Sequence, residues 1–361
     1  MQKKLIALAI TAAFASAPAF ADVSVYGVMD AGVYSHDSGA ASNSKTSGIG
    51  SSGYTTSRLG FKGSTDLGNG MSALFNLEAE IVPTSGQFVS KSANGANLFK
   101  RASVVGLSSE SMGTVTIGRQ NTPEYATLGG FDSTGGSNVG GLVAFYGQTS
   151  TDRVDNSALY KSPVFSGFQA QLLYSSQFSS GLTESATTTS AGNFYNYQVA
   201  YAGGPISAAL GGQHANNTAV TGTLYSNIYI MGKYDFGVAS VAAGYITKKN
   251  DSTTAGVATP NAADTKHTWI GVNVPVSSVV MVGAVIEKLK ATGGATGNDV
   301  TGYGLDATYA LAKSTKLYVA YGSADNKAGA TVGSDVATGG TFGAVAGGKA
   351  TTLMAGINYS F

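Results

Sequence analysis

Charged side chains recur at alternate positions in several short segments of the chain. The predicted inward rows of three such segments hold Arg58, Lys62, Asn76, Glu78, Arg101 and Ser103. A charged group is costly to bury without a partner, but it is stable on a wall that meets water. These residue types at this spacing therefore predict the lining of an aqueous channel.

Catalytic and metal chemistry have no matching pattern. His36, His214 and His267 lie far apart in the sequence, so neither a triad nor a zinc site has the required spacing. Residues 48–53 match G-x-G-x-x-G, but they lie in a Ser/Gly-rich stretch without a following helix, which favours a flexible loop over a dinucleotide site. The scattered Asp and Asn residues lack the spacing of a calcium loop. We expect no cofactor, no metal and no enzyme activity.

Strands must position the charged rows, because apolar and polar residues alternate along most of the chain and helical spacing fits these segments poorly. The pattern predicts about 16 strands, an even number that lets the first and last strands pair and close the sheet. They begin near residues 23, 54, 71, 98, 114, 153, 168, 193, 206, 224, 238, 265, 279, 299, 316 and 350.

Short turns alternate with long polar loops, as in outer-membrane barrels. The predicted turns span residues 66–70, 109–113, 162–167, 203–205, 235–237, 275–278 and 312–315. The predicted loops span residues 35–53, 83–97, 121–151, 178–192, 248–264 and 326–348. The fold class is therefore all-β, a transmembrane antiparallel β-barrel with a lumen wide enough for water and small solutes.

Aromatic residues fit the two interfaces of a membrane. The last strand carries an apolar row that consists of Leu353, Ala355, Ile357, Tyr359 and Phe361, which suits a surface facing lipid. Interface girdles are a better interpretation than a sugar-stacking path for Tyr195, Tyr197, Tyr201, Tyr225, Tyr229, Tyr234, Trp269 and Tyr359.

Residues 1–21 have the features of a cleaved signal peptide: Lys3 and Lys4, an apolar run over residues 5–14, and a small-x-small site at residues 19–21. A membrane anchor is the rival interpretation, but the run is short. Residues 22–361 are expected to form one barrel domain. Cys is 0, so disulfides and thiolate chemistry are excluded, and charged residues at 11% make the chain too neutral for nucleic-acid binding.

Several segments together resemble the general, non-specific porins of Gram-negative bacteria, most closely the neisserial and β-proteobacterial type. The resemblance spans residues 22–361. Its carriers are Val25-Tyr26-Gly27-Val28-Met29-Asp30, Ser57-Arg58-Leu59-Gly60-Phe61-Lys62-Gly63, Asp66-Leu67-Gly68-Asn69-Gly70, Leu77-Glu78-Ala79-Glu80, Gly113-Thr114-Val115-Thr116-Ile117-Gly118-Arg119, Asp155-Asn156-Ser157 with Tyr160, and the terminal Phe361.

The resemblance implies a homotrimer of 16-stranded barrels, in which a long third loop, here residues 121–151, folds inward and narrows the pore. It also implies a pore constriction in which basic residues face acids. The matching positions are Arg58, Arg101 and Arg153 against Glu78 and Asp132, with Lys62 as a further basic candidate and Glu80, Glu124 and Asp155 as weaker acidic ones.

The expected function is a passive diffusion channel for small hydrophilic solutes and ions across the Gram-negative outer membrane, with a modest anion preference from the arginines. The resemblance implies that Phe361 is read by the outer-membrane assembly machinery, and the further expected partners are outer-membrane lipid and lipopolysaccharide. A substrate-preferring anion porin is an alternative. An outer-membrane barrel enzyme and an exported adhesin without a lumen are rivals from other classes.

Overall fold

The structure is a computed structural model, and it describes residues 22–42, 44–89, 98–178, 192–216, 223–254, 257–259, 264–292, 297–334 and 343–361. The expected signal peptide, residues 1–21, lies outside the described residues. Among the helices that the structure describes, none is long and apolar enough to cross a membrane.

The described residues form nineteen strands in one antiparallel sheet, and sixteen of these strands make up the barrel wall. The wall strands are β1 (Asp22–Asp37), β3 (Arg58–Gly68), β4 (Met71–Val82), β6 (Ala102–Ser109), β7 (Gly113–Asn121), β8 (Arg153–Lys161), β9 (Phe168–Phe178), β10 (Gly192–Gly203), β11 (Ile206–Asn216), β12 (Thr223–Asp235), β13 (Ser240–Thr254), β15 (Asp264–Pro275), β16 (Val280–Thr292), β17 (Val300–Ala312), β18 (Thr315–Asn326) and β19 (Lys349–Ser360).

Three short strands lie in the connections: β2 (Lys45–Ser51), β5 (Gln87–Phe88) and β14 (Val257–Thr259). The sequence did not predict them as separate strands. They extend the hydrogen-bonded pairing of β1, β4 and β13 into the long loops. Two helices, α2 (Pro123–Leu128) and α3 (Val143–Tyr146), lie between β7 and β8.

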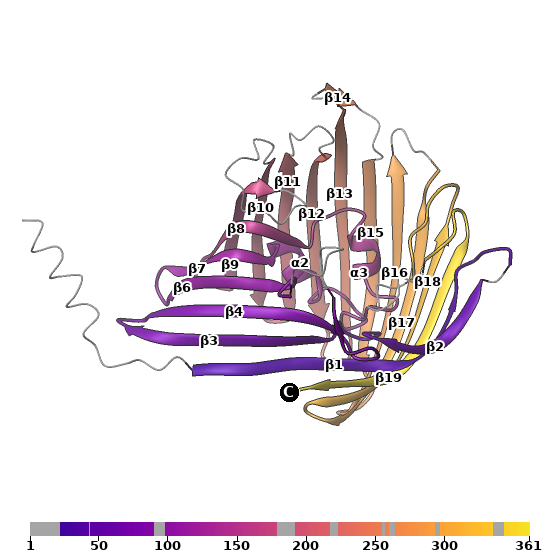
Figure 1. Ribbon diagram of the computed structural model, residues 1–361, viewed down its shortest axis with the longest axis horizontal. Helices are drawn as coiled ribbons and strands as arrows, with labels where there is room; N and C mark the ends of the chain where they lie inside the picture. Colours follow the sequence, from indigo (N-terminus) through magenta and orange to yellow (C-terminus); the bar gives the residue numbers. More distant parts are fainter. Residues whose placement is uncertain are drawn as a thin grey trace, which may run out of the picture.

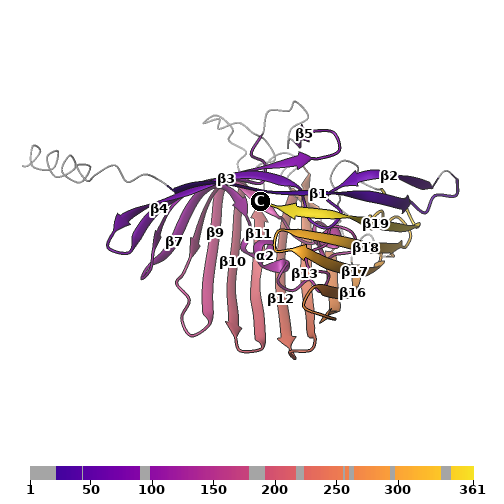
Figure 2. The same ribbon diagram turned by 90° about the horizontal axis from the view of Figure 1, so that it is seen from below.

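The sheet closes because β1 pairs with β19 as well as with β3 (Figures 1 and 2). The register joins Val28 to Ser360 and continues to Asp37 opposite Thr351. Phe361 completes this seam by exchanging backbone hydrogen bonds with Gly27, at 3.0 and 3.1 Å. A Cβ atom on Gly27 would lie 2.4 Å from the Phe361 ring, so a glycine is required beneath the terminal aromatic.

The predicted strand count and antiparallel class are confirmed. Every predicted start lies within four residues of the start of a wall strand, with the largest differences at β3 and β6. Connections of two to six residues join alternate strand pairs at one rim, and the long loops lie at the other. Closure removes the open edges that a flat sheet of this size would expose.

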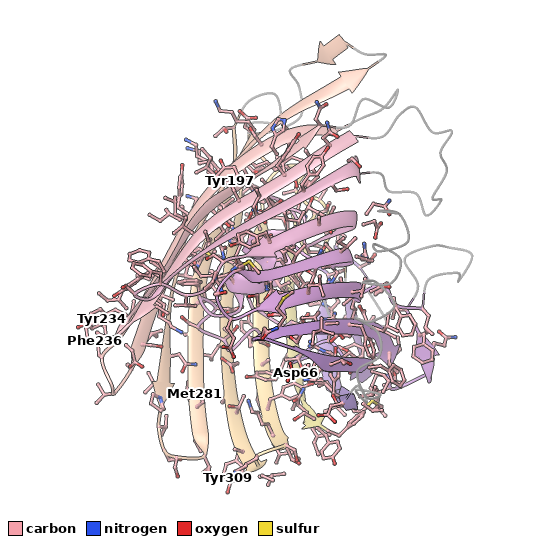
Figure 3. All side chains as sticks on the ribbon, turned by 90° about the vertical axis from the view of Figure 1, so that its left-hand side faces the viewer. Asp66, Tyr197, Tyr234, Phe236, Met281 and Tyr309 are labelled. Carbon is pink, nitrogen blue, oxygen red and sulfur yellow. The ribbon has the colours of Figure 1, made fainter. Side chains whose placement is uncertain are left out.

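The two faces of many wall strands differ in exposure. In β12, Ile228 and Ile230 are exposed, whereas Tyr229 and Met231 are buried on the other face. The exposed row faces outward: Figure 3 shows Tyr234, Phe236 and Tyr309 projecting from the outer face near the short turns. Because strand side chains alternate, the buried row faces the interior.

The prediction that Ser103 faces inward is wrong. Ser103 shares the row of Val105 and Leu107, which are exposed on the outer face. Strand β6 begins only at Ala102, and Arg101 precedes it in a bend, with its backbone N–H donating to the carbonyl of Glu78. The side chain of Arg101 therefore reaches the interior, but its direction does not determine which residues of β6 face inward.

The connection between β7 and β8, residues 122–152, packs against buried side chains of β11, β12, β13, β15 and β16. Its Leu128, Phe131, Leu142 and Tyr146 form one apolar cluster with wall residues. The wall contributes Ala209, Tyr229, Met231, Ala242, Ile246, Trp269 and Val285. Tyr229 and Trp269, with Tyr225, thus lie inside the barrel, and their assignment to interface girdles is wrong.

Candidate functional site

Adjacent strands bring the predicted charged residues to one place on the interior wall. Arg58 is the first residue of β3 and is opposite Glu80 in β4, while Glu78 is opposite Ala102, the residue after Arg101. The alternation of β3 and β4 directs Arg58 and Glu78 to the same face. Strands β3 and β4 and the residue that precedes β6 therefore supply one cluster.

The acids of this cluster are paired. Arg101 Nε lies 2.6 Å from Glu78 Oε1, and Arg101 Nη1 lies 3.6 Å from Glu80 Oε2. Lys100 Nζ lies 2.9 Å from the same Glu80 oxygen. All of these side chains are largely buried, so the ion pairs fix the position of Arg101 and compensate much of its charge.

Arg58 differs from Arg101 in its partners. Its Nε donates to the carbonyl of Thr56 at 2.9 Å, and no carboxylate among the described residues lies within ion-pair distance of its guanidinium. Arg58 lines two neighbouring cavities, one on each side of the cluster. Its charge is therefore the less compensated of the two.

Arg153 joins the cluster from the first position of β8. Its Nη1 lies 2.6 Å from Asp152 Oδ2, its guanidinium lies 5.0 Å from the centroid of the Tyr125 ring, and its Nε donates to the carbonyl of Arg101 at 3.2 Å. Stacking on an aromatic face holds a planar guanidinium in place. The cluster is thus tied to α2 through Tyr125.

Asp132 is held by its own loop. Its carboxylate accepts hydrogen bonds from Thr134 N at 2.9 Å, Thr134 Oγ1 at 2.7 Å and Leu142 N at 2.9 Å. Burial raises the pKa of this carboxyl group, and the three donors partly offset that effect. It shares a cavity of about 200 Å³ with Arg58 and Arg101, but it forms no ion pair with either of them in the described structure.

A second cavity, of about 530 Å³, continues from the cluster toward the short turns. Arg58, Glu78 and Arg101 lie at one end, and Lys161 lies at the end of β8. Its remaining lining includes Asn76, Thr114, Thr116, Gln120 and Gln171. Charged, amide and hydroxyl groups around an open space provide a hydrated path for polar solutes.

Several interior lysines, among them Lys161 and Lys316, were missed by the sequence interpretation. Lys161 has no acidic partner within the described chain, and Lys316 Nζ lies 5.5 Å from the centroid of the Tyr54 ring. Lys62, which was predicted, lies 5.1 Å from the Tyr26 ring, whose hydroxyl is 2.9 Å from Glu78 Oε2. The strand alternation that located Lys62 could have located both.

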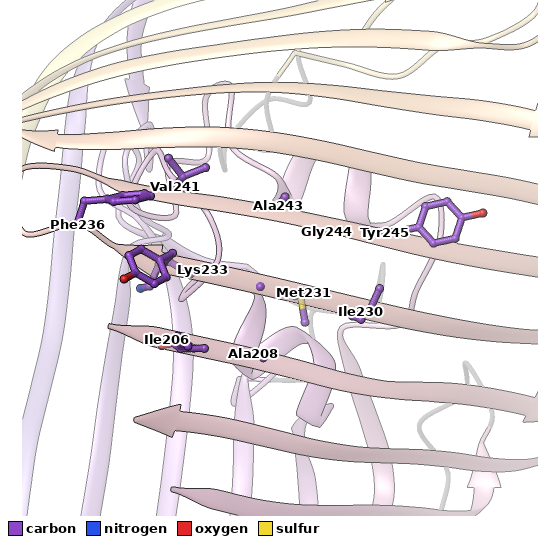
Figure 4. A pocket seen from close by; sticks show the side chains of 13 residues that line it. Ile206, Ala208, Ile230, Met231, Lys233, Phe236, Val241, Ala243, Gly244 and Tyr245 are labelled. Carbon is purple, nitrogen blue, oxygen red and sulfur yellow. The ribbon is translucent and has the colours of Figure 1, made fainter. Parts of the chain in front are cut away.

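A different groove, of about 800 Å³, lies on the outer face between β11, β12 and β13 (Figure 4). Small residues such as Ala208 and Ala243 form its floor, and Ile230, Tyr245 and Phe236 form its sides. It contains no charged cluster and faces away from the interior. The groove is therefore part of the apolar exterior.

Histidine chemistry is absent from the cluster. His267 Nε2 lies 2.9 Å from Glu287 Oε2 on the interior of β15 and β16, where both side chains are buried beneath Phe145. No group of three potential metal-binding side chains exists in the part of the chain that the structure describes. Arg119 Nη1, at the end of β7, lies 2.6 Å from Asp155 Oδ1.

A closed barrel with an apolar exterior and fixed charges around interior cavities defines a β-barrel channel of the outer membrane. A model of the Gram-negative porin family matches residues 6–329 of the chain. The protein therefore belongs to the Gram-negative porin family, and it is a non-enzymatic passive channel located in the outer membrane.

Known proteins agree with this membership. Outer membrane porin protein 32 of Delftia acidovorans is 32% identical over 372 aligned positions, which cover 100% of both chains. The solved structure of the anion-selective porin from Comamonas acidovorans gives a TM-score of 0.79 at 27% identity, over 95% of this chain and 100% of that chain. The fold is also similar to that of the trimer form of OmpT, an outer membrane protein of Vibrio cholerae, with a TM-score of 0.70 at 18% identity over 94% of this chain and 99% of that chain.

Proposed function

We propose that this porin carries small hydrophilic solutes with a modest preference for anions, and that Arg58 is the main origin of that preference. The observation that carries the proposal is the unequal pairing of the cluster. Four cations, Arg58, Lys100, Arg101 and Arg153, meet three carboxylates, Glu78, Glu80 and Asp152. Lys100, Arg101 and Arg153 each have an ion-pair partner and Arg58 has none in the described structure, so the charge of Arg58 raises the local concentration of anions.

The narrowest part of the channel lies, in this proposal, between this cluster and the loop of residues 122–152. Both cavities adjoin the cluster and contain loop residues, Tyr125 in one and Pro123 in the other. Arg58, Arg101 and Arg153 supply the basic side and Glu78 an acidic partner, while Lys62 extends the basic side toward the short turns. Asp132 contributes by shaping the loop, since its oxygens are occupied by loop donors.

Reversal potentials across a salt gradient, measured with purified protein in planar bilayers, test the selectivity. We expect a modest excess of anion over cation permeability. Clear cation selectivity would overturn the proposal. A saturable current that a phosphate or organic anion blocks would favour the substrate-preferring alternative, whereas a current linear in concentration would count against it.

A homotrimer is supported by the distribution of outer-face aromatics. Tyr160, Tyr174, Tyr195 and Tyr197 are exposed on β8–β10, but the outward rows of β1, β3, β4, β6 and β7 carry no tyrosine or tryptophan in the described chain. Tyr and Trp favour the membrane interface, so a face without them suits contact with protein. We place the subunit contact there. Cross-linking between cysteines introduced on β1 and β3 should yield a covalent trimer.

Phe361 is proposed to act in assembly, together with the outer-membrane insertion machinery. Deleting Phe361 removes the terminal hydrogen bonds to Gly27 and the ring that covers it. We expect a lower yield of inserted barrels and an unchanged conductance for the barrels that do insert. Normal yield from the deletion variant would reduce Phe361 to part of the aromatic girdle.

A further inference from the structure

The two ends of the loop of residues 122–152 meet four amide side chains on the barrel wall. These are Asn196 and Gln198 on β10, Gln213 on β11 and Asn227 on β12, and each is nearly fully buried. A buried amide is costly unless its donors and acceptors are satisfied. Four such groups side by side indicate a surface built to bind polar backbone and side-chain atoms.

The loop supplies those atoms from both of its ends. Gln213 Oε1 accepts from Thr151 N at 2.8 Å, and Gln213 Nε2 lies 3.3 Å from Thr122 Oγ1. Gln198 Nε2 donates to Thr127 Oγ1 at 2.9 Å, and Asn196 Oδ1 accepts from Glu124 N at 3.2 Å. The start and the end of the loop are therefore bound to the same wall.

The carboxyl group of Glu124 lies at the centre of this contact and is fully buried. Its Oε1 accepts from Ser150 Oγ at 2.6 Å, and its Oε2 accepts from Asn227 Nδ2 at 3.1 Å. Asn227 Nδ2 also donates to the carbonyl of Thr149 at 3.2 Å. One carboxyl group thus joins the start of the loop, the end of the loop and the wall.

No basic side chain pairs with Glu124 among the described residues. The titratable groups that face it are the phenols of Tyr146, Tyr225 and Tyr229, and Asp152 in turn faces Tyr146 and Tyr225. A lysine on this wall, Lys248, donates to the carbonyl of Gln148 at 3.4 Å and lies 4.7 Å from the Tyr225 ring. Ionisation would therefore place an uncompensated charge in the interior, which is costly.

Burial raises the pKa of Glu124 from 4.5 to about 8, and the hydrogen bonds from Ser150 and Asn227 partly offset the rise. A carboxyl group that is released into water would titrate near its ordinary value. Protons therefore favour the docked loop. The group is neutral over much of the pH range in which an exposed glutamate is charged.

We propose that Glu124 is a positioning residue of the channel: its neutral carboxyl group holds the loop on the wall amides, and its ionisation loosens the loop and increases its excursions. The inference rests on the proposed function, since it assigns regulation to the same constriction. Arg58 and its partners would determine the ion selectivity, and Glu124 would determine how often the loop leaves its docked position.

The sign of the effect follows from the two pKa values. Docking is most favourable below about pH 4.5, where both states are protonated. Between about pH 4.5 and pH 8 the docked loop keeps its proton and the released loop loses it, so the docking equilibrium weakens by up to about tenfold per pH unit. Above about pH 8 both states are ionised and the equilibrium no longer changes.

Single-channel recording between pH 5 and pH 9 tests the inference with purified protein at fixed salt and voltage. In the unaltered protein, we expect current excursions to become more frequent with rising pH and to level off above about pH 8. Glu124→Gln, which cannot ionise, should give a frequency that does not vary with pH. Glu110→Gln, at an exposed short turn, is the matched control and should keep the original curve.

A second variant, Ser150→Ala, tests the inference even if Glu124→Gln assembles poorly. Ser150→Ala leaves the titrating group in place but removes a donor that stabilises its ionised form, so the curve should move to higher pH. A flat curve in the unaltered protein, or an unchanged curve in either loop variant, would overturn the inference. Absence of ion conduction at every pH would instead refute the proposed channel function.

Discussion

The two sides of the barrel interior are built from different kinds of side chain. On β3, β4 and β8, Arg58, Glu78 and Lys161 surround open cavities together with Arg101, which precedes β6. On β11–β16, Tyr229, Ile246 and Trp269 pack against the loop and leave the interior filled. We call these the hydrated side and the packed side. The contrast teaches that one closed wall can line open, charged cavities on one side and bind a loop by ordinary core packing on the other.

The largest expected effect comes from weakening the packed side. Leu142→Ala removes a fully buried loop side chain from the apolar cluster and should lower the free energy of unfolding by about 2–5 kcal/mol. Urea titration in detergent measures the loss, and single-channel recording should show more frequent excursions.

Leu317→Ala is the matched control, because Leu317 lies on the outer face and remains partly exposed. Its effect should stay below about 1 kcal/mol, since surface substitutions are usually small. Equal losses in the two variants would mean that the loop cluster is not a core, and the contrast between the sides would fail.

Charge changes on the hydrated side should shift selectivity in opposite directions. Arg58→Gln should lower the anion-to-cation permeability ratio, and Glu78→Gln should raise it by releasing Arg101 from its partner. One charge about 6 Å from a passing ion in water contributes about 0.7 kcal/mol, or about threefold in the ratio. Reversal potentials at low salt measure both changes. Shifts of the same sign would contradict the assignment.

A smaller effect is expected from Lys161→Gln, because Lys161 lies farther along the cavity than Arg58. A charge roughly 15 Å from the narrowest point contributes about 0.3 kcal/mol in water, or about 1.6-fold in the permeability ratio. The change should disappear at 1 M salt, where charges are screened within about 3 Å. Persistence at high salt would indicate a structural effect instead.

The smallest change in selectivity is expected from a substitution on the packed side. Glu287→Gln changes a buried carboxyl group on the packed side, where Glu287 contacts His267 beneath Phe145. The reversal potential should remain unchanged, because Glu287 lines neither of the two cavities beside the charged cluster. A shift as large as that of Arg58→Gln would show that ions also pass on the packed side.

The alternation of apolar and polar residues in the sequence predicted most of the fold and part of the site. It located Arg58, Lys62 and Glu78 because a strand fixes the facing of every second residue. It failed at Ser103, because Arg101 lies in a bend before β6 and the inward–outward alternation of the strand begins only at Ala102. Lys161 was available from the same alternation but was not recognised, since it lies at the very end of β8.

The packed side could not be predicted from local pattern. In β12, Ile228 and Ile230 face outward while Tyr229 and Met231 face inward, so both rows are apolar and the sequence gives no reason to separate lipid contact from loop contact. The partners of Glu124 lie 26 and 103 positions away in the sequence, at Ser150 and Asn227. Only the closed barrel brings them together.

The seam between β1 and β19 has a consequence for the order of folding. The two strands that must pair contain residues from opposite ends of the chain, as in Val28 opposite Ser360. Contacts between distant positions form late and slowly, because a long loop must close before they can be made. Until Phe361 arrives beside Gly27, two strand edges stay open to pairing with other chains. A barrel that closes by pairing its first and last strands can do so only after all of its wall strands are available. Its intermediates therefore expose unpaired strand edges and need protection until the barrel closes.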